Sequence, residues 1–375
     1  MLYKNAYIFD KGNGFFRGEI RVEDGRFTEL IHGSTDEPGQ DMQGAYIIPG
    51  LIDIHTHGNS GADFSDGDYE GLVSMARYYA HHGITSFAPA SMTLPYEVLA
   101  EAFACAQKFA SDAPSGCAVL RGINMEGPFF SMKKKGAQNG DYIKKPDYEA
   151  LNKLQEGCGG LIKIVDVAPE TEGAIDFIKK AKDIARVSIA HTDTDYDTAV
   201  QAFDAGATHL THMFNAMPGI HHRNPGPICA AAERDDIVAE LICDGLHIHE
   251  SVIRTAFKLF PGRICIISDS LRCCGMPDGE YMLGGQSVYL KDNVARLSDG
   301  TIAGSATNLF DCLKNVIRFG IDMKEAINSA TIVPARELGC DDIVGSIEAG
   351  KIADFVLCDA DLNMSEVYSA GLKIL

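Results

Sequence analysis

The sequence predicts an α/β protein: a (β/α)8 TIM-type barrel beside a small β-sandwich domain that both ends of the chain form. Three observations lead to this prediction. After residue 50, short β-rich runs alternate with segments of helical spacing, which is typical of βα units around a parallel sheet. Eight such runs occur, the number of parallel strands that closes a barrel. Both ends of the chain instead alternate apolar and polar residues between Gly-rich turns, which indicates antiparallel strands.

The N-terminal part of the predicted β-sandwich covers residues 1–48, where AYIFDKG and EIRVEDGRFTEL show the alternating pattern. The barrel is predicted over residues 49–342. Its strands are expected at LIDIH (51–55), TSFA (85–88), AVLRGINME (118–126), LIKIVDVA (161–168), VSIAH (187–191), THLTH (208–212), IVAELI (237–242) and CIISD (265–269).

Helices are expected between these strands. Two examples are EVLAEAFACAQKFA, which ends before Ser111, and AIDFIKKAKDIA, which ends before Arg186. Gly83 and Gly206 stand where helices commonly end. After the eighth strand, residues 279–304 predict an inserted β-hairpin. The C-terminal part of the β-sandwich covers residues 343–375, where IVGSIEAGKIADFVLCDADL alternates again.

Composition and charge exclude several classes of function. The formal net charge is −19 and the longest basic run is Lys133-Lys134-Lys135, expected in a solvated loop, so neither nucleic acid nor an anionic membrane is an expected partner. No apolar stretch is long enough to span a bilayer, and MLYKNAYIFDKG lacks the pattern of a signal peptide. The 11 cysteines show no CxxC spacing, which indicates reduced thiols and predicts a cytoplasmic location.

The segment LIDIHTHG places two histidines at the end of a buried strand. Because strand side chains alternate between faces, Asp53, His55 and His57 would point the same way. Imidazole is a common ligand for zinc and similar divalent ions, so the pair suits a metal. A histidine on an apolar face is also often a hydrogen-bonded core residue. Taken alone, the pair therefore leaves both interpretations open.

Polar residues at the other strand ends favour the metal. Active sites of such barrels lie at the C-terminal ends of the strands. The strand ends carry His55 and His57 (first), Glu126 (third), His191 (fifth), His212 (sixth), His247 (after the seventh) and Asp269 (eighth). Nitrogen and carboxylate ligands that leave an open position form a catalytic divalent site, in which the pKa of a bound water falls toward neutrality. Asp269 would then be the base.

The chain resembles the amidohydrolase superfamily. The matching segments, in order, are PGLIDIHTHG, MEGPFFSMKKKGAQN, AHTD, THMFNAM with HHRNPGP, DGLHIH, SDSLRCCGMPDGEYMLGG and the closing GSIEAGKIADFVL. This resemblance covers essentially the whole chain. It implies metal-dependent hydrolysis of the acetamide of N-acetylglucosamine 6-phosphate, with the galactosamine epimer as an alternative. It also implies a homodimer.

The resemblance further implies roles for individual residues. Glu126, His191 and His212 would bind the catalytic metal, and Asp269 would shuttle protons. One or two divalent ions per chain are expected; zinc is expected first, while iron, cobalt, nickel and manganese are alternatives. Substrate contacts are implied for Ala137, Gln138, Asn215, Ala216, His247, Ile302, Ala303 and Gly304. Arg223 would bind the phosphate across a dimer interface, since an Arg fork offers two donors in one plane.

Two departures from the superfamily pattern affect the metal count. Gln138 stands where some members carry a histidine that polarises the substrate carbonyl, and some of those members lack the HxH pair. Here HxH is intact, so a second metal on His55, His57 and a bridging Glu126 would replace the missing histidine. The sequence SDS around Asp269 and the Cys273-Cys274 pair also differ from the usual pattern, but leave the base in place.

Two other interpretations are weighed against this one. Cyclic amidases of the superfamily typically bridge two metals with a carbamylated lysine, where this chain has Glu126. A catalytically silent scaffold that binds partners would not need Glu126, His191, His212 and Asp269 together. A metal assay combined with acetate release separates the scaffold from the enzyme.

Overall fold

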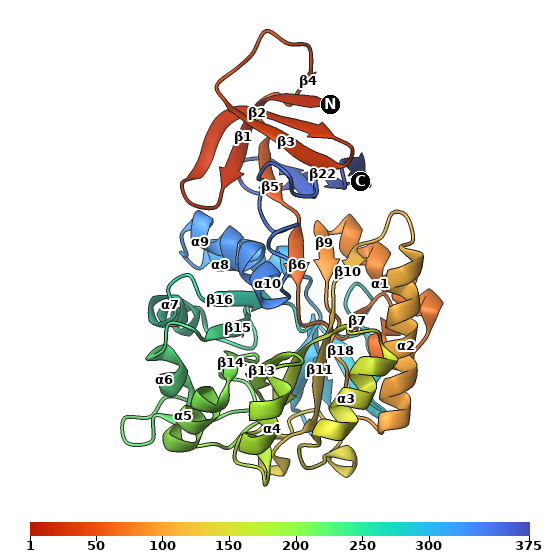
Figure 1. Cartoon of the computed structure of the whole chain (residues 1–375), viewed down its shortest axis with the longest axis vertical. Helices are drawn as coiled ribbons and strands as arrows, with labels where there is room; N and C mark the ends of the chain where they lie inside the picture. The colour runs from red at the N-terminus through yellow and green to blue at the C-terminus, as the bar shows by residue number, and fades with distance from the viewer.

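A computed structural model describes residues 1–375. The chain forms a small β domain, which holds both termini, and a larger α/β region (Figure 1). One eight-stranded sheet makes up the small domain, in the order β23-β22-β21-β5-β1-β2-β3, with β4 paired to β1. Its strands are β1 (Leu2–Asp10), β2 (Gly14–Glu23), β3 (Arg26–His32), β4 (Gln40–Asp41), β5 (Tyr46–Pro49), β21 (Phe355–Cys358), β22 (Met364–Ser369) and β23 (Leu372–Lys373).

This sheet is continuous rather than divided into two stacked sheets, and it curls. The rings of Phe27 on β3 and Phe355 on β21 lie 6.0 Å apart, although three strands separate β3 from β21 in the sheet. Backbone bonds also join β3 to the segment that precedes β21, since Phe27 N donates to Lys351 O and Gly350 N donates to Phe27 O. An irregularity in β1, where Asn5 has φ 55°, bends the sheet as bulges do. The curled sheet encloses its own apolar core.

The larger region contains every predicted parallel strand. A three-stranded sheet has the order β10-β9-β6 and a six-stranded sheet runs from β11 to β16 in sequence order, all pairs being parallel. These strands are β6 (Leu51–Asp53), β9 (Ile84–Phe87), β10 (Val119–Leu120), β11 (Ile123–Phe129), β12 (Ile162–Val167), β13 (Arg186–Ile189), β14 (Ala207–Leu210), β15 (Val238–Ile242) and β16 (Ile264–Ile267). The third predicted strand is therefore interrupted, as β10 and β11.

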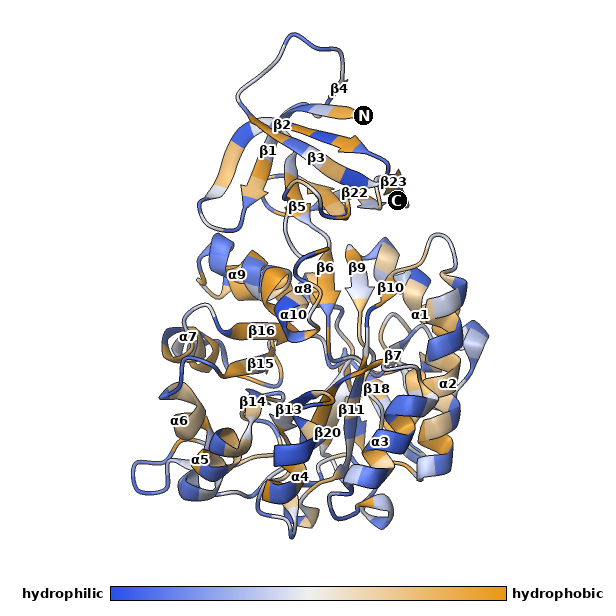
Figure 2. Cartoon of the chain, in the orientation of Figure 1, coloured by the Kyte–Doolittle hydropathy of each residue, from blue (hydrophilic) through white to orange (hydrophobic).

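Backbone contacts connect the two parallel sheets. A parallel bridge pairs Ala90 with Asn124, and Asp269 N donates to His55 O at 2.9 Å just beyond the ends of β16 and β6. Figure 2 shows β15 and β16 as mostly hydrophobic, as expected for strands that are covered on both faces. Because β5 ends at Pro49 and β6 starts at Leu51, the small domain adjoins the N-terminal end of β6. The opposite strand ends are free to carry a site.

Helices follow most of the strands. They are α1 (Tyr69–His81), α2 (Tyr96–Asp112), α3 (Tyr148–Gly157), α4 (Ala174–Ala181), α5 (Tyr196–Ala205), α6 (Gly226–Ala232), α7 (Glu250–Leu259), α8 (Leu309–Arg318), α9 (Met323–Ser329) and α10 (Ile332–Glu337). Asp68 and Asp195 cap the first turns of α1 and α5 with side-chain hydrogen bonds. Gly206 ends α5 with a positive φ, as the sequence predicted. None of the helices is long and apolar enough to cross a membrane.

The prediction of one hairpin over 279–304 was wrong, because this segment forms a four-stranded antiparallel sheet. The chain reverses at Gly284-Gly285, at Asp292-Asn293 and near Gly300, so it has three turns where the prediction counted one. The strands are β17 (Gly279–Leu283), β18 (Gln286–Lys291), β19 (Val294–Leu297) and β20 (Ile302–Ser305). Short elements complete the region: β7 (Gly58–Asn59), β8 (Ala62–Asp63), η1 (Phe64–Asp66), η2 (Met132–Lys134) and η3 (Gly140–Tyr142).

Candidate metal and active site

Three of the predicted site residues stand in a strained backbone turn directly after a strand. His191, His212 and Asp269 are each the second residue beyond the end of β13, β14 and β16, and their φ angles are 42°, 27° and 46°. A left-handed conformation in a non-glycine residue costs on the order of 1 kcal/mol or more, and such residues cluster at functional sites. The turn brings all three side chains to one end of the parallel sheets.

Glu126 on β11 is the centre of this group. Its Oε1 lies 3.0 Å from His191 Nε2 and 3.2 Å from His212 Nε2, and these two ring nitrogens are 3.1 Å apart. His57 Nε2 lies 3.3 Å from the other carboxylate oxygen, and His55 Nε2 is 3.6 Å from Oε1. Four imidazoles therefore face one buried carboxylate.

Asp269 adds a second carboxylate. Its Oδ1 lies 3.3 Å from His57 Nε2 and 3.8 Å from His55 Nε2. The structure holds two overlapping sets of ligand atoms that lie within 4.8 Å of one another. One set is His55, Glu126 and His212, and the other is His55, His57 and Asp269.

The donor set fits a divalent cation. His55 Nε2 is completely buried and has no hydrogen-bond partner, which is costly unless something binds it. The outer ring nitrogens of His57 and His191 instead face backbone carbonyls, Ala90 O at 3.1 Å and Lys134 O at 2.9 Å. Donation of the Nδ1 proton to a carbonyl leaves the Nε2 lone pair for a metal.

The electrostatics favour charged carboxylates. Burial raises the pKa of Glu126, but its hydrogen bonds with His191 and His212 outweigh burial and hold that pKa well below its ordinary value. Burial likewise raises the pKa of Asp269, and its pairing with His57 and the nearby charge of His55 lower it overall. Both carboxylates are therefore ionised at neutral pH.

A cavity of about 340 Å³ opens onto this cluster, a size suited to a small molecule. It collects twelve of the predicted site residues: Glu126, Ala137, Gln138, His191, His212, Asn215, Ala216, His247, Asp269, Ile302, Ala303 and Gly304. His55 and His57 do not line the cavity but contact Glu126 and Asp269 from the buried side. The ends of the parallel strands and the start of β20 therefore line the same cavity.

Gln138 is fixed against Glu126. Its Nε2 donates to Glu126 Oε2 at 2.6 Å, and its Oε1 accepts from Thr93 N at 2.8 Å. Its side chain is only 3% exposed. The structure therefore gives Gln138 a defined orientation beside the ligand cluster.

His247 and Arg223 differ in their relation to the cavity. His247 lines it, and its Nδ1 donates to Asp244 Oδ2 at 2.7 Å. Burial lowers the pKa of His247, but Asp244 raises it above its ordinary value overall. Arg223 is exposed and lies outside the cavity of its own chain, where its Nη1 contacts His222 Nε2 at 2.7 Å.

Sequence reasoning missed Glu240 and Asp244. Glu240 is completely buried, and its Oε2 accepts from His55 Nδ1 at 2.9 Å and from His212 N at 3.0 Å. A carboxylate in the middle of the apolar run IVAELI was the available signal. A buried charge in such a run needs a partner, and none is adjacent in the sequence.

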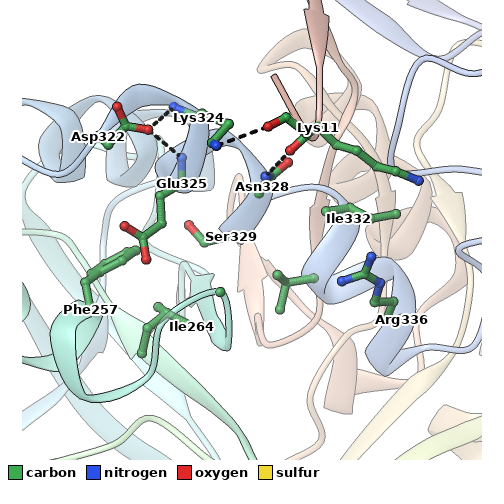
Figure 3. Close-up of a pocket in the computed structure, with 13 residues that line it drawn as sticks. Lys11, Phe257, Ile264, Asp322, Lys324, Glu325, Asn328, Ser329, Ile332 and Arg336 are labelled. Carbon is green, nitrogen blue, oxygen red and sulfur yellow. Dashed lines mark hydrogen bonds between the residues drawn. The ribbon is translucent and has the colours of Figure 1, made fainter. Parts of the chain in front are cut away.

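A larger cavity, of about 630 Å³, lies elsewhere, between the β1–β2 turn, α9 and α10 (Figure 3). Asn328 Nδ2 donates to Lys11 O at 2.8 Å and Lys324 Nζ to Gly12 O at 3.1 Å, so its polar groups mainly join α9 to the small domain. No predicted site residue lines it. The candidate site is therefore identified by the ligand and acid–base residues that line the smaller cavity, and not by cavity size.

Comparison with known proteins gives a consistent result. A sequence model described as the amidohydrolase family matches residues 46–372. A Bacillus subtilis (strain 168) protein named N-acetylglucosamine-6-phosphate deacetylase is 36% identical, over 96% of this chain and 93% of its own. An Escherichia coli O157:H7 protein named N-acetylgalactosamine-6-phosphate deacetylase is 33% identical, over 94% and 93%. The solved N-acetyl-D-glucosamine-6-phosphate deacetylase of Mycobacterium smegmatis has a TM-score of 0.94 and 28% identity, covering 100% of both chains.

Proposed function

The chain belongs to the amidohydrolase family, and we propose that it removes the acetyl group of N-acetylglucosamine 6-phosphate, giving glucosamine 6-phosphate and acetate. One observation carries this function: relatives with this activity in their names match nearly the whole chain, while the predicted ligands and base surround a single cavity. A catalytically silent scaffold would not be expected to keep four imidazoles and two carboxylates in mutual contact.

Divalent metal is part of the proposal. Glu126, His191 and His212 would hold one ion, and His55, His57 and a bridging Glu126 would hold a second. When bound, such ions polarise a carbonyl and lower the pKa of water. Zinc is the first expectation, because imidazole and carboxylate ligands suit it, although other divalent ions accept the same ligands.

Asp269 would move the proton. Its carboxylate is ionised at neutral pH and lies at the cavity wall, so it can accept a proton from the water that attacks the acetamide carbonyl. The protonated carboxyl then returns that proton to the nitrogen as the C–N bond breaks. A single group thus acts as base and then as acid, and the amine leaves in neutral form.

The remaining cavity residues would bind the sugar phosphate. His247 offers an imidazole N–H donor whose positive charge Asp244 favours by raising its pKa, and Asn215 offers an amide. Residues 302–304 and Ala216 also line the cavity. The galactosamine epimer is the second candidate, because the relative named for it is nearly as similar as those named for the glucosamine substrate.

Acetate release tests the function directly. We expect release from N-acetylglucosamine 6-phosphate at a kcat/KM well above that for the galactosamine epimer and for unphosphorylated N-acetylglucosamine. The reverse order of the two epimers would favour the alternative substrate. No release from any of them by metal-loaded protein would contradict the proposal and favour the scaffold.

The proposal includes a homodimer in which Arg223 reaches the site of the neighbouring subunit. Its exposure, outside its own cavity, supports this placement. Arg223→Ala should raise KM for the phosphorylated sugar far more than for the unphosphorylated one, because only the former presents charge to the guanidinium. Arg318→Ala, on the surface of α8, is a matched control.

A mixing experiment separates action across the interface from action within one chain. Asp269→Asn and Arg223→Ala proteins, each inactive or weak alone, are mixed and allowed to exchange subunits. If Arg223 acts across the interface, one site of each mixed dimer has an intact Asp269 and an intact partner arginine, so activity returns. Mixed dimers without recovered activity would place Arg223 in its own site.

The proposal also covers architecture and location. We take the two parallel sheets to close into one (β/α)8 barrel, which the bridge between Ala90 and Asn124 and the bond from Asp269 N to His55 O support. A cytoplasmic location is supported by the 11 free cysteines, since none is paired in a disulfide.

A further inference from the structure

A row of buried charged side chains leads away from His55 through the interior of the parallel sheets. Glu240 Oε2 accepts from His55 Nδ1 at 2.9 Å, and Glu240 Oε1 lies 3.1 Å from His209 Nε2. His209 Nδ1 donates to Glu337 Oε2 at 2.6 Å, and the same oxygen lies 3.1 Å from Arg186 Nε. We call Glu240, His209, Glu337 and Arg186 the buried charge chain.

The charges in this chain alternate. Both ring nitrogens of His209 lie close to carboxylate oxygens, and an imidazolium suits both contacts, although only the contact of Nδ1 with Glu337 has hydrogen-bond geometry; Nε2 and Glu240 Oε1 form an ion pair by distance alone. Burial lowers the pKa of His209, but Glu240 and Glu337 raise it overall to about 9. From Arg186 to Glu240 the sequence of charges is therefore plus, minus, plus, minus.

The chain connects two ends of the molecule. His209 and Glu240 are completely buried, and Glu337 is 5% exposed. Arg186 begins β13, its side chain is 29% exposed, and its guanidinium also donates to Arg336 O and Glu337 O. Because His191 follows the other end of β13, Arg186 lies at the end of the sheet remote from the metal ligands.

Such a chain is a costly way to fill the interior. Barrel interiors are usually packed with branched apolar residues, and a buried ion pair is commonly no more stable than apolar side chains of the same volume. Stability alone therefore does not explain four charged groups in a row. Their one contact with the candidate site is through Glu240, which binds His55 Nδ1 and the backbone N–H of His212.

We propose that the buried charge chain positions His55 and thereby sets the affinity of the ion that His55 and His57 hold. Arg186, Glu337 and His209 hold Glu240 in place through their successive contacts. Glu240 then accepts the Nδ1 proton of His55 and aims the Nε2 lone pair at the ligand cluster. This inference rests on the two-ion site of the proposed function. All four members are positioning residues, because none reaches the cavity.

The test is metal binding by the full-length protein, independent of acetate release. The protein is titrated with zinc against a competing chelator, and the cobalt-substituted form is followed by its visible absorption. His209→Gln should weaken the more loosely bound ion about tenfold, since outer partners of metal ligands are worth 10–100-fold in affinity. The ion held by Glu126, His191 and His212 should keep its affinity within about twofold.

Three further variants make the test decisive. Arg186→Met, at the partly exposed end, should weaken the same ion in the same direction by a smaller factor, and Arg186→Lys should restore most of the affinity. Glu19→Gln is the matched control, because Glu19 is a buried, ion-paired carboxylate in the small domain with no path to the site. It should change thermal stability but neither ion. If His209→Gln does not fold, the two Arg186 variants decide.

The proposal is overturned by either of two results. One is parental affinity for both ions in His209→Gln and Arg186→Met, which would make the chain purely structural. The other is a parent protein that binds one ion at saturation, since no second ion would then depend on His55. Acetate release by that parent would still stand, so the two proposals fail independently.

Discussion

Replacement of Asp269 by asparagine should abolish most turnover while leaving the fold intact. The backbone at this position has φ 46°, a conformation that asparagine tolerates better than most residues. The two main-chain bonds, Asp269 N to His55 O at 2.9 Å and Ser305 N to Asp269 O at 2.8 Å, are unaffected by the change. The amide oxygen can still face His57, so the melting temperature should change little.

The expected loss of rate follows from the role of the carboxylate. An amide cannot accept a proton from water, and positioned acid–base groups are worth about 10²–10⁴-fold. We therefore expect kcat to fall about 10³-fold, equivalent to about 4 kcal/mol. Asp269→Ala should lose activity equally but also lose about 1 kcal/mol of stability, because alanine is less tolerant of the left-handed backbone.

Acetate release, metal content and thermal unfolding are measured together for both variants. Asp354→Asn provides the matched control, since Asp354 is a buried carboxylate that accepts a hydrogen bond from Ala370 N, next to the small domain, and does not line the cavity. Its kcat should stay far above the kcat of Asp269→Asn. Near-parental kcat in Asp269→Asn, with normal metal content, would refute the assignment of the base.

Two further predictions concern the metal count and the pH dependence. Metal analysis of the parent protein should find close to two ions per chain, and the double variant His55→Gln with His57→Asn should bind about one ion and turn over more slowly. Adding Gln138→His to the double variant should restore part of the lost rate. A parent protein that binds only one ion would contradict this prediction. Because Asp244 raises the pKa of His247, the imidazolium is present below that raised pKa and is lost as pH rises through it, so KM for the phosphorylated sugar should increase with pH. Asp244→Asn should move that increase to lower pH, and an unchanged KM profile would exclude His247 as a charged contact.

The parallel strands were predictable because they are short apolar runs with polar ends. Seven of the eight runs each coincide with one strand and the third with two, β10 and β11, and the histidines that end three of the runs meet around Glu126. The local sequence pattern is enough to predict these strands, because a parallel strand that is buried on both faces consists almost entirely of apolar residues. The twelve cavity residues came from the resemblance as well as from the strand ends.

What the sequence did not reveal depends on long-range pairing. Glu240 and Glu337 were not recognised, because their partners lie far away in the sequence: His55 follows β6, and His209 is on β14. The curl of the small sheet was missed for the same reason, since it depends on β3 meeting the segment before β21. The segment 279–304 was misjudged locally: its second and third turns use Asp292-Asn293 and Gly300, which were not counted as turns.

The division of the small sheet between the two ends of the chain has a consequence for biosynthesis. β5 needs β1 on one side and β21 on the other, and roughly 300 residues separate it from β21. At about 5–20 residues per second, a ribosome adds those residues in about 15–60 s, during which β5 presents an unpaired, apolar edge. Premature termination anywhere in the parallel sheets would leave that edge open permanently. The nascent chain is therefore most prone to aggregate before its last strands emerge, and a chaperone that shields residues 46–49 would act during that interval.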